Sequence, residues 1–127
     1  MTDEIKILVA EDEEQLRELL QIVLEDEGYQ VDAAKDGQVA SELMMKKTYD
    51  VLLTDLYMPK VNGIELIQST KKNFPKTKNI LVSGGGKELV AKHGEKSISF
   101  NGEIISIDMF LKKPCELDDI LEAIKSS

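Results

Sequence analysis

Short apolar runs alternate with amphipathic stretches along most of the chain. Five runs have the composition of buried strands: residues 5–10, 30–34, 51–55, 80–82 and 109–111. The stretch after the first run carries apolar residues three and four positions apart, which is the spacing of one face of a helix. This stripe consists of Leu16, Leu19, Leu20, Val23 and Leu24, and Gly28 stands where the helix should end.

Three more helical stripes follow, each after a predicted strand. They comprise Val39, Ala40, Leu43 and Met44; Ile64, Leu66 and Ile67; and Leu117, Ile120, Leu121 and Ile124. Asp36 precedes the first of these as a predicted N-cap, and the Pro- and Gly-containing loop 58–63 precedes the second, which Pro75 ends. Strands that alternate with helices predict one α/β domain over residues 1–127, built on a parallel sheet with helices on both faces.

The segment 87–108 has more than one interpretation. Parallel strands need a crossover connection, usually a helix, so we expect a helix somewhere in this segment. One candidate is a short helix over residues 87–93. Alternating residues around the Asn101-Gly102 pair instead predict a β-hairpin. A third possibility is a crossover helix over residues 100–105 that tolerates Gly102, and the pattern alone does not choose among the three.

Composition and charge narrow the function classes. The 127 residues carry a net charge of −8, so the chain lacks the basic surface that non-specific nucleic-acid binding needs. No apolar run approaches the ~20 residues of a membrane span, and the acidic N-terminus lacks the features of a secretory signal. The lone Cys115 cannot form an internal disulfide, and with a single histidine it excludes a Cys/His metal site. We therefore expect a cytoplasmic protein that binds neither nucleic acid nor membranes directly.

Polar side chains stand just beyond the carboxyl ends of four predicted strands: Glu11, Asp12, Asp55, Ser83 and Lys113. In an open sheet of the flavodoxin-like order 2-1-3-4-5, the first and third strands are neighbours and ligands bind beyond those ends. The three carboxylates would repel one another unless a hard cation such as Mg²⁺ joined them. Lys113 adds a point charge, and Ser83 adds a hydroxyl donor for a phosphoryl oxygen. Each residue alone has a commoner structural role, Asp12 for instance as a helix cap, but five together predict a magnesium- and phosphoryl-binding site.

Four motifs in order resemble the receiver domain of two-component response regulators. They are Ile-Leu-Val-Ala-Glu11-Asp12-Glu13, Leu-Leu-Thr-Asp55-Leu-Tyr-Met58-Pro59 with Gly63, Ile-Leu-Val-Ser83-Gly, and Phe110-Leu-Lys-Lys113-Pro114. The resemblance runs from about residue 6 to residue 125. It implies that Asp55 is the phosphoacceptor, which takes a phosphoryl group from a phosphohistidine on a histidine kinase or histidine phosphotransfer protein.

The resemblance also implies a role for each remaining site residue. Glu11 and Asp12 match the acidic pair of the family. Asp12, Asp55 and the backbone carbonyl of Tyr57 would bind Mg²⁺ directly, and Glu11 would reach it directly or through water. Lys113, rather than Lys112, would balance their charge, because the family places this lysine immediately before a proline. The Lys113–Pro114 peptide bond is expected to be cis, a state that only proline makes accessible at low energy. Ser83 and Phe110 would form a switch pair whose hydroxyl and ring change position on phosphorylation.

The implied function is that of a protein switch rather than a turnover enzyme. Phosphorylation would change binding to a downstream protein by a monomer or weak dimer. Two features depart from the family pattern: Glu11 stands where aspartate is commoner, and the interval from Ser83 to Phe110 is longer than usual. That interval holds the surface that most receivers use to signal. We predict a receiver domain over 1–127 with no output domain, and a receiver portion of a larger regulator or hybrid kinase is the alternative.

Two other classes of protein on this fold are disfavoured by single positions. A flavin-binding electron carrier needs a hydroxyl- and glycine-rich phosphate loop after its first strand. This chain has four acids there, from Glu11 to Glu14, which would repel a phosphate. A metal-dependent phosphatase would have an additional acid two residues after its nucleophile, where Tyr57 stands.

Overall fold

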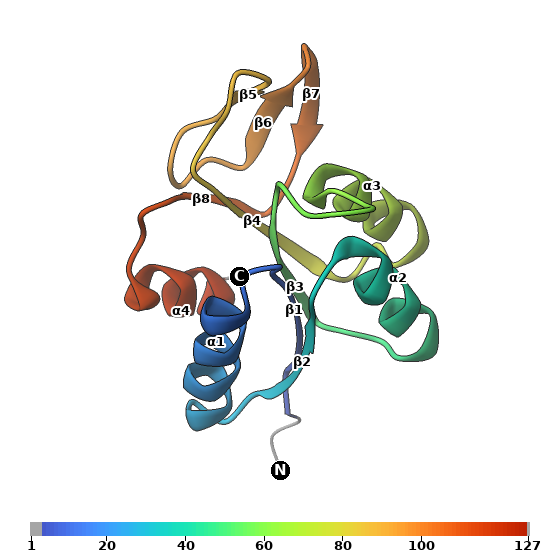
Figure 1. The fold of residues 1–127 in the computed structure, drawn as a ribbon, viewed down its shortest axis with the longest axis vertical. Helices are drawn as coiled ribbons and strands as arrows, with labels where there is room; N and C mark the ends of the chain where they lie inside the picture. The colour runs from blue at the N-terminus through green and yellow to red at the C-terminus, as the bar shows by residue number, and fades with distance from the viewer. Residues whose placement is uncertain (1–3, 127) are drawn as a thin grey trace.

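A computed structural model describes residues 4–126 and contains a central sheet of five parallel strands (Figure 1). The strands are β1 (Lys6–Ala10), β2 (Gln30–Ala34), β3 (Val51–Asp55), β4 (Lys78–Ser83) and β8 (Met109–Lys112). Their order across the sheet is β2-β1-β3-β4-β8. This order is that of the five predicted strands taken as 2-1-3-4-5, so the flavodoxin-like, doubly wound topology is confirmed.

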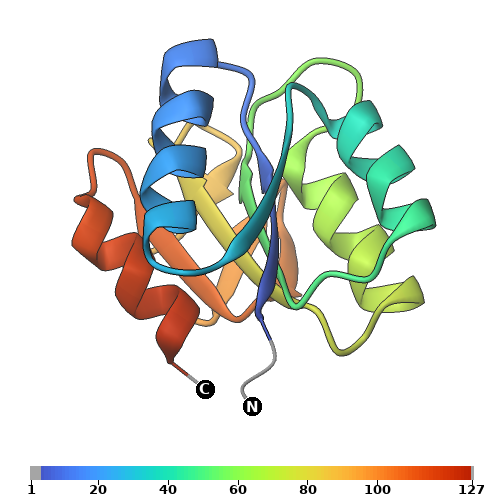
Figure 2. The ribbon, with the colours of Figure 1, turned by 90° about the horizontal axis from the view of Figure 1, so that it is seen from below.

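Four helices cover the two faces of this sheet (Figure 2). They are α1 (Glu14–Asp26), α2 (Gly37–Lys46), α3 (Gly63–Asn73) and α4 (Leu117–Lys125). Leu8 and Leu52 point to the face covered by α2 and α3, whereas Val9 and Leu53 point to the face covered by α1 and α4. Successive residues of a strand face opposite ways, which is why these strands had to be apolar at nearly every position.

Local signals in the sequence set where the helices begin and end. The Asp36 carboxylate accepts a 2.8 Å hydrogen bond from the backbone N–H of Val39, so Asp36 is the predicted N-cap of α2. Gly28 follows α1 with a φ of +98°, a left-handed conformation that favours glycine. The N-cap of α1 is Glu13, without a side-chain capping bond. Asp12 therefore does not serve as that cap.

A second, three-stranded antiparallel sheet connects β4 to β8 and lies at the top of Figure 1. It consists of β5 (Leu89–Val90), β6 (Ser97–Phe100) and β7 (Glu103–Ser106) in the order β5-β6-β7. The expectation of a crossover helix in segment 87–108 was wrong in both of its forms, and the hairpin prediction is confirmed. Asn101 and Gly102 have φ values of +51° and +80°, the two left-handed residues of a tight hairpin turn.

The small sheet can replace a crossover helix because it buries an apolar face of its own. Leu89, Ile98 and Ile105 are buried and join the core cluster that also contains residues of α2 and α3. On the opposite face, Val90, Ser99 and Ile104 stand in one cross-strand row. The burial that a helix would supply through one stripe is supplied here by the alternate residues of three short strands.

The outer edge of β8 is covered by the chain that precedes β6. The N–H of Gly94 donates to the carbonyl of Phe110 at 2.6 Å, and the N–H of Phe110 donates to the carbonyl of Glu95 at 2.9 Å. Two residues along the strand, the N–H of Lys112 donates to Nδ1 of His93 at 3.0 Å. Segment 93–95 thus supplies partners for an edge strand without forming a strand itself. None of the helices between residues 4 and 126 is long and apolar enough to cross a bilayer.

Candidate functional site

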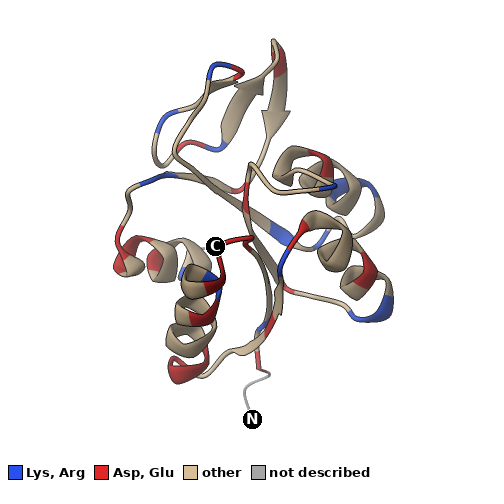
Figure 3. Cartoon of the chain, in the orientation of Figure 1, with Lys and Arg blue, Asp and Glu red and all other residues tan. Residues whose placement is uncertain are grey.

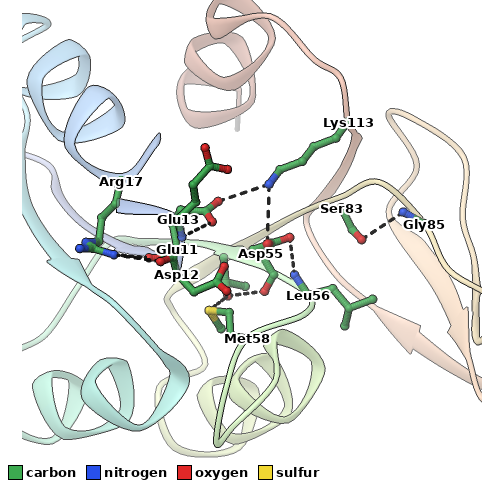
Figure 4. Close-up of polar contacts among 11 residues, drawn as sticks. Glu11, Asp12, Glu13, Arg17, Asp55, Leu56, Met58, Ser83, Gly85 and Lys113 are labelled. Atoms are coloured by element: carbon green, nitrogen blue, oxygen red, sulfur yellow. Dashed lines mark hydrogen bonds and ion pairs between the residues drawn. The ribbon is translucent and has the colours of Figure 1, made fainter. Parts of the chain in front are cut away.

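Three carboxylates meet at the carboxyl ends of the neighbouring strands β1 and β3. Glu11 and Asp12 directly follow β1, and Asp55 is the last residue of β3. The two strands pair in parallel, with Ala10 opposite Thr54, so the residues that follow lie side by side. One carboxylate oxygen from each acid lies within 4.8 Å of the other two (Figure 4). The three acids predicted from their positions at the strand ends therefore lie together in the structure.

Lys113 reaches the same cluster from the end of β8. Its Nζ lies 3.3 Å from Oε1 of Glu11 and 3.6 Å from Oδ2 of Asp55. Figure 4 shows the ammonium pointing between these two carboxylates. The competing candidate, Lys112, has an exposed side chain, and its backbone N–H donates to His93, which lies outside the acidic cluster. The lysine that immediately precedes Pro114 is therefore the one in the site.

Backbone groups hold the acids in place. The N–H of Leu56 donates to Oδ1 of Asp55 at 2.9 Å, and the N–H of Glu13 donates to Oε2 of Glu11 at 3.1 Å. Gly63, at the start of α3, packs so closely that a Cβ there would clash with the carbonyl oxygen of Asp55. The glycine in the loop motif is thus needed for the close approach of α3 to β3.

Arg17 is a supporting residue that the sequence analysis missed. One of its guanidinium nitrogens donates to the backbone carbonyl of Glu11 at 3.0 Å and to that of Asp12 at 3.4 Å. Because both acceptors are main-chain oxygens, Arg17 positions the acidic loop without neutralising its carboxylates. The signal was present in the sequence, since an arginine one turn into a helix can reach back to the loop that precedes it.

Burial and charge act in opposite directions on the ionisable groups. Burial raises the pKa of both Glu11 and Asp55, because the charged form of each loses contact with water. Lys113 and nearby backbone N–H groups oppose that rise. For Lys113, burial acts to lower the pKa, but the Asp55 and Glu11 carboxylates outweigh it, and the pKa is raised. Further positive charge beside Glu11 and Asp55 would therefore favour the charged form of both carboxylates.

The donor set fits a hard divalent cation. Three carboxylates converge from one loop and one strand end, and no sulfur or imidazole ligand lies among them. Mg²⁺ prefers oxygen ligands of this kind and retains positions for water or phosphoryl oxygen. Glu11, Asp12 and Asp55 could therefore hold Mg²⁺.

The other predicted site residues surround this cluster. Ser83 is 1% exposed, and its hydroxyl oxygen accepts a 3.2 Å hydrogen bond from the N–H of Gly85 (Figure 4). Phe110 is also 1% exposed, and its ring packs in the core on the α2 and α3 side of the sheet. Val82 pairs with Asp55, so Ser83 lies one position beyond Asp55 in the sheet. Leu81 pairs with both Thr54 and Phe110, so Phe110 lies one position before Asp55. The Lys113–Pro114 peptide bond is cis.

Tyr57 makes a contact that the sequence did not suggest. Its hydroxyl donates a 2.7 Å hydrogen bond to the carboxylate of Glu88, which directly precedes β5. The ring also lies against Gly86, where a Cβ would clash with the hydroxyl. The loop after Asp55 is thereby joined to the small sheet. No local pattern predicts such a contact, because the partners are 31 residues apart.

Comparison with known proteins identifies relatives over nearly the whole chain. A family model described as the response regulator receiver domain matches residues 7–125. The transcriptional regulatory protein ResD of Bacillus subtilis is 33% identical over 125 residues, which cover 98% of this chain and 48% of ResD. The transcriptional regulatory protein DltR of Streptococcus agalactiae is 31% identical over 121 residues, which cover 95% of this chain and 50% of DltR. The chain spans about half the length of these curated relatives.

Solved structures show the same architecture. The response regulator protein TrrA from Thermotoga maritima, in complex with Mg(2+)-BeF, aligns with a TM-score of 0.76 and 27% identity, covering 95% of this chain and 96% of TrrA. A CheY-like response regulator receiver domain protein from Methanospirillum hungatei aligns with a TM-score of 0.79 and 25% identity, covering 97% of this chain and 92% of that one.

Proposed function

The chain belongs to the response regulator receiver domain family, and on that premise we propose that Asp55 accepts a phosphoryl group in a Mg²⁺-dependent reaction. The donor is a phosphohistidine on a histidine kinase or a histidine phosphotransfer protein. The observation that carries the proposal is the convergence of Glu11, Asp12 and Asp55 within 4.8 Å, with Lys113 beside two of them. A structural ion pair needs only two partners, whereas this cluster holds three acids and one base.

The transfer step follows from the chemistry of the carboxylate. An oxygen of Asp55 attacks the phosphorus, a P–O bond forms and the P–N bond breaks, and the product is an acyl phosphate. The histidine ring, protonated on its other nitrogen, leaves as neutral imidazole. Glu11, Asp12, Asp55 and the backbone carbonyl of Tyr57 would hold Mg²⁺, which would supply positive charge to the carboxylates and to the phosphoryl oxygens. The ammonium of Lys113, which lies beside Asp55, stabilises the negative charge that remains on the phosphoryl oxygens.

Ser83 and Phe110 report the state of Asp55. The Ser83 hydroxyl oxygen accepts from Gly85, so its hydrogen is free to donate to a phosphoryl oxygen. Movement of the Ser83 hydroxyl toward Asp55 would vacate space that Phe110, on the neighbouring strand and two positions back in register, can fill. Phosphorylation thus shifts the equilibrium between two packings of the ends of β4 and β8, and the surface formed by these ends then binds or releases a downstream protein. The role is that of a signalling switch and not of a turnover enzyme.

The test is transfer of labelled phosphate from a small phosphodonor such as acetyl phosphate. The wild-type chain should take up label in Mg²⁺ and lose it on treatment with hydroxylamine, which cleaves acyl phosphates. Asp55→Asn should take up none, and chelation of Mg²⁺ should also abolish labelling. The matched control is Asp26→Asn, which removes an exposed carboxylate at the far end of α1. Labelling that persists in Asp55→Asn would refute the assignment.

A further inference from the structure

A cavity of about 420 Å³ lies between α1 and α4, beneath the acidic site. Its walls are apolar side chains from both helices and from the sheet between them: Leu16 and Leu20 of α1, Leu53 and Val82 of the sheet, and Leu117 and Ile120 of α4. In Figures 1 and 2 these two helices lie next to each other on one face of the sheet.

One end of this cavity is formed by the ionisable groups of the site. Glu11, Asp55 and Lys113 line it together with the apolar residues. A hollow with apolar walls and a few polar groups at one end is the usual form of a site for a small organic molecule. Nothing in the phosphoryl transfer proposed above uses the apolar part of this cavity.

The charge around the polar end favours a cation. Two carboxylates and one ammonium line it, and a carboxylate oxygen of Asp12 lies within 4.8 Å of an oxygen of each of those acids, so this end carries an excess of negative charge. Figure 3 shows further acidic residues on both α1 and α4, the helices that form the walls. An anionic head group would enter this field against repulsion, whereas an ammonium would find carboxylate acceptors in Glu11 and Asp55.

We propose that the cavity binds a small amphiphilic amine, with its apolar body between α1 and α4 and its ammonium at the Glu11 and Asp55 carboxylates. A dry cavity of about 150 Å³ admits benzene, so the volume here, about 420 Å³, accommodates an aryl ring with a short alkyl chain. The ammonium occupies the carboxylates that Mg²⁺ needs, so the amine acts as a competitive inhibitor of phosphorylation. This regulatory consequence rests on the proposed function, but binding itself does not.

The first test measures binding by titration, without Mg²⁺ or a phosphodonor, using three probes of nearly equal size. These are 3-phenylpropylamine, 3-phenylpropan-1-ol and 3-phenylpropionate, followed by amide chemical shifts. The amine should bind about tenfold more tightly than the alcohol and more tightly still than the acid. Shifts should centre on α1 and α4. Equal affinity for amine and alcohol, or preference for the acid, would overturn the assignment of the head group.

A matched pair of variants tests the position of the apolar body. Leu16→Phe enlarges a side chain that lines the cavity, and Leu19→Phe makes the same change on the exposed side of the same helix. Leu16→Phe should weaken the amine about tenfold by filling the space, and Leu19→Phe should leave its affinity unchanged. Equal affinities of the two variants would place the amine elsewhere.

Cys115 provides a second measurement that needs no variant. It lines the cavity and is the only cysteine of the chain. Saturating 3-phenylpropylamine should slow its alkylation by iodoacetamide several-fold, and an unchanged rate would contradict occupation of the cavity. Adding Mg²⁺ should then raise the apparent Kd of the amine. If Asp55 is not labelled yet the amine binds, the proposed function is refuted and the amine site is supported. If labelling proceeds and the amine does not bind, only the amine site is refuted.

Discussion

Tyr57 and Glu88 join the loop after the acidic site to the start of the small sheet through one hydrogen bond of 2.7 Å. Tyr57→Phe removes this bond and nothing else. Because both side chains are exposed, the free energy of unfolding should change by less than about 1 kcal/mol. The effect should appear in how the small sheet responds to the site. Beryllofluoride, a mimic of the phosphoryl group, should change amide hydrogen exchange in β5 of the wild type and change it less in Tyr57→Phe.

The control for this comparison is Tyr29→Phe. Tyr29 is half-buried, and among the described residues its hydroxyl makes no hydrogen bond. Its removal should leave the response of β5 intact. An unaltered response in Tyr57→Phe would show that the small sheet does not sense Asp55 through this contact.

Lys113→Met should destabilise the chain when Mg²⁺ is absent. The side chain of Lys113 is 30% exposed and pairs with two carboxylates, so the loss should be about 1–3 kcal/mol, between the values for exposed and buried pairs. Mg²⁺ should restore more stability to this variant than to the wild type, because the acids then have no other cation. The measurement is denaturant unfolding with and without Mg²⁺. Lys112→Met, at an exposed neighbour, should be neutral, and a similar loss in both variants would contradict the assignment of Lys113 to the site.

Gly63→Ala should cost about 1–3 kcal/mol of unfolding free energy, as overpacking does. The added methyl would clash with the carbonyl of Asp55, so the loop after β3 or the start of α3 must shift. Labelling of Asp55 should slow as well, since the shift moves the phosphoacceptor. Gly84→Ala is the matched control, because a Cβ at Gly84 meets open space. The prediction fails if the two alanine variants unfold at the same denaturant concentration.

The contact between Tyr49 and Asp32 should make stability depend on pH. The Tyr49 hydroxyl donates to the Asp32 carboxylate at 2.6 Å, and this bond, together with Lys47, lowers the pKa of Asp32. A lowered pKa in the folded state means that the stabilisation is complete at neutral pH and is lost as the pH falls through that folded pKa. Tyr49→Phe should thus cost about 1–2 kcal/mol at neutral pH.

That cost should shrink as unfolding is measured from neutral pH down to about pH 3. Tyr49 is 2% exposed and keeps its apolar ring in the variant, so packing should contribute little to the difference. Lys47→Met offers a comparison, since this ion pair is largely exposed and its removal should change stability by less than about 1 kcal/mol. A cost of Tyr49→Phe that does not vary with pH would exclude the charge of Asp32 as its cause.

Much of the fold followed from hydrophobic periodicity, because strands buried on both faces and helices buried on one face leave different patterns. Leu8 and Val9 are adjacent, yet they face opposite layers, and this requires a helix on each side of the sheet. The sequence did not decide between a helix and a hairpin in segment 87–108, and the reason is physical. A parallel crossover is usually helical, and that general rule competed with the local signal of Asn101 and Gly102. The local signal was correct, since two consecutive left-handed residues fit a tight turn and not a helix.

The candidate site was predictable as far as it depends on strand ends. Glu11, Asp55 and Lys113 each follow or end a strand, so the topology alone brings them together. Arg17 was missed although its place one turn into α1 lets it reach back to the acidic loop, whereas Glu88 was not predictable because its contact with Tyr57 joins residues 31 positions apart. Contacts of that kind require the tertiary structure.

The backbone partners that segment 93–95 provides for β8 also bear on how the protein behaves at high concentration. An uncovered edge strand offers free N–H and C=O groups to another molecule, and strand addition at such edges leads to aggregation. Here both backbone groups of Phe110 and the N–H of Lys112 already have partners within the chain. Association of copies through this end of the main sheet would first require the His93 and Glu95 contacts to break. Segment 93–95, which links β5 to β6, therefore blocks strand addition at the β8 edge of the main sheet.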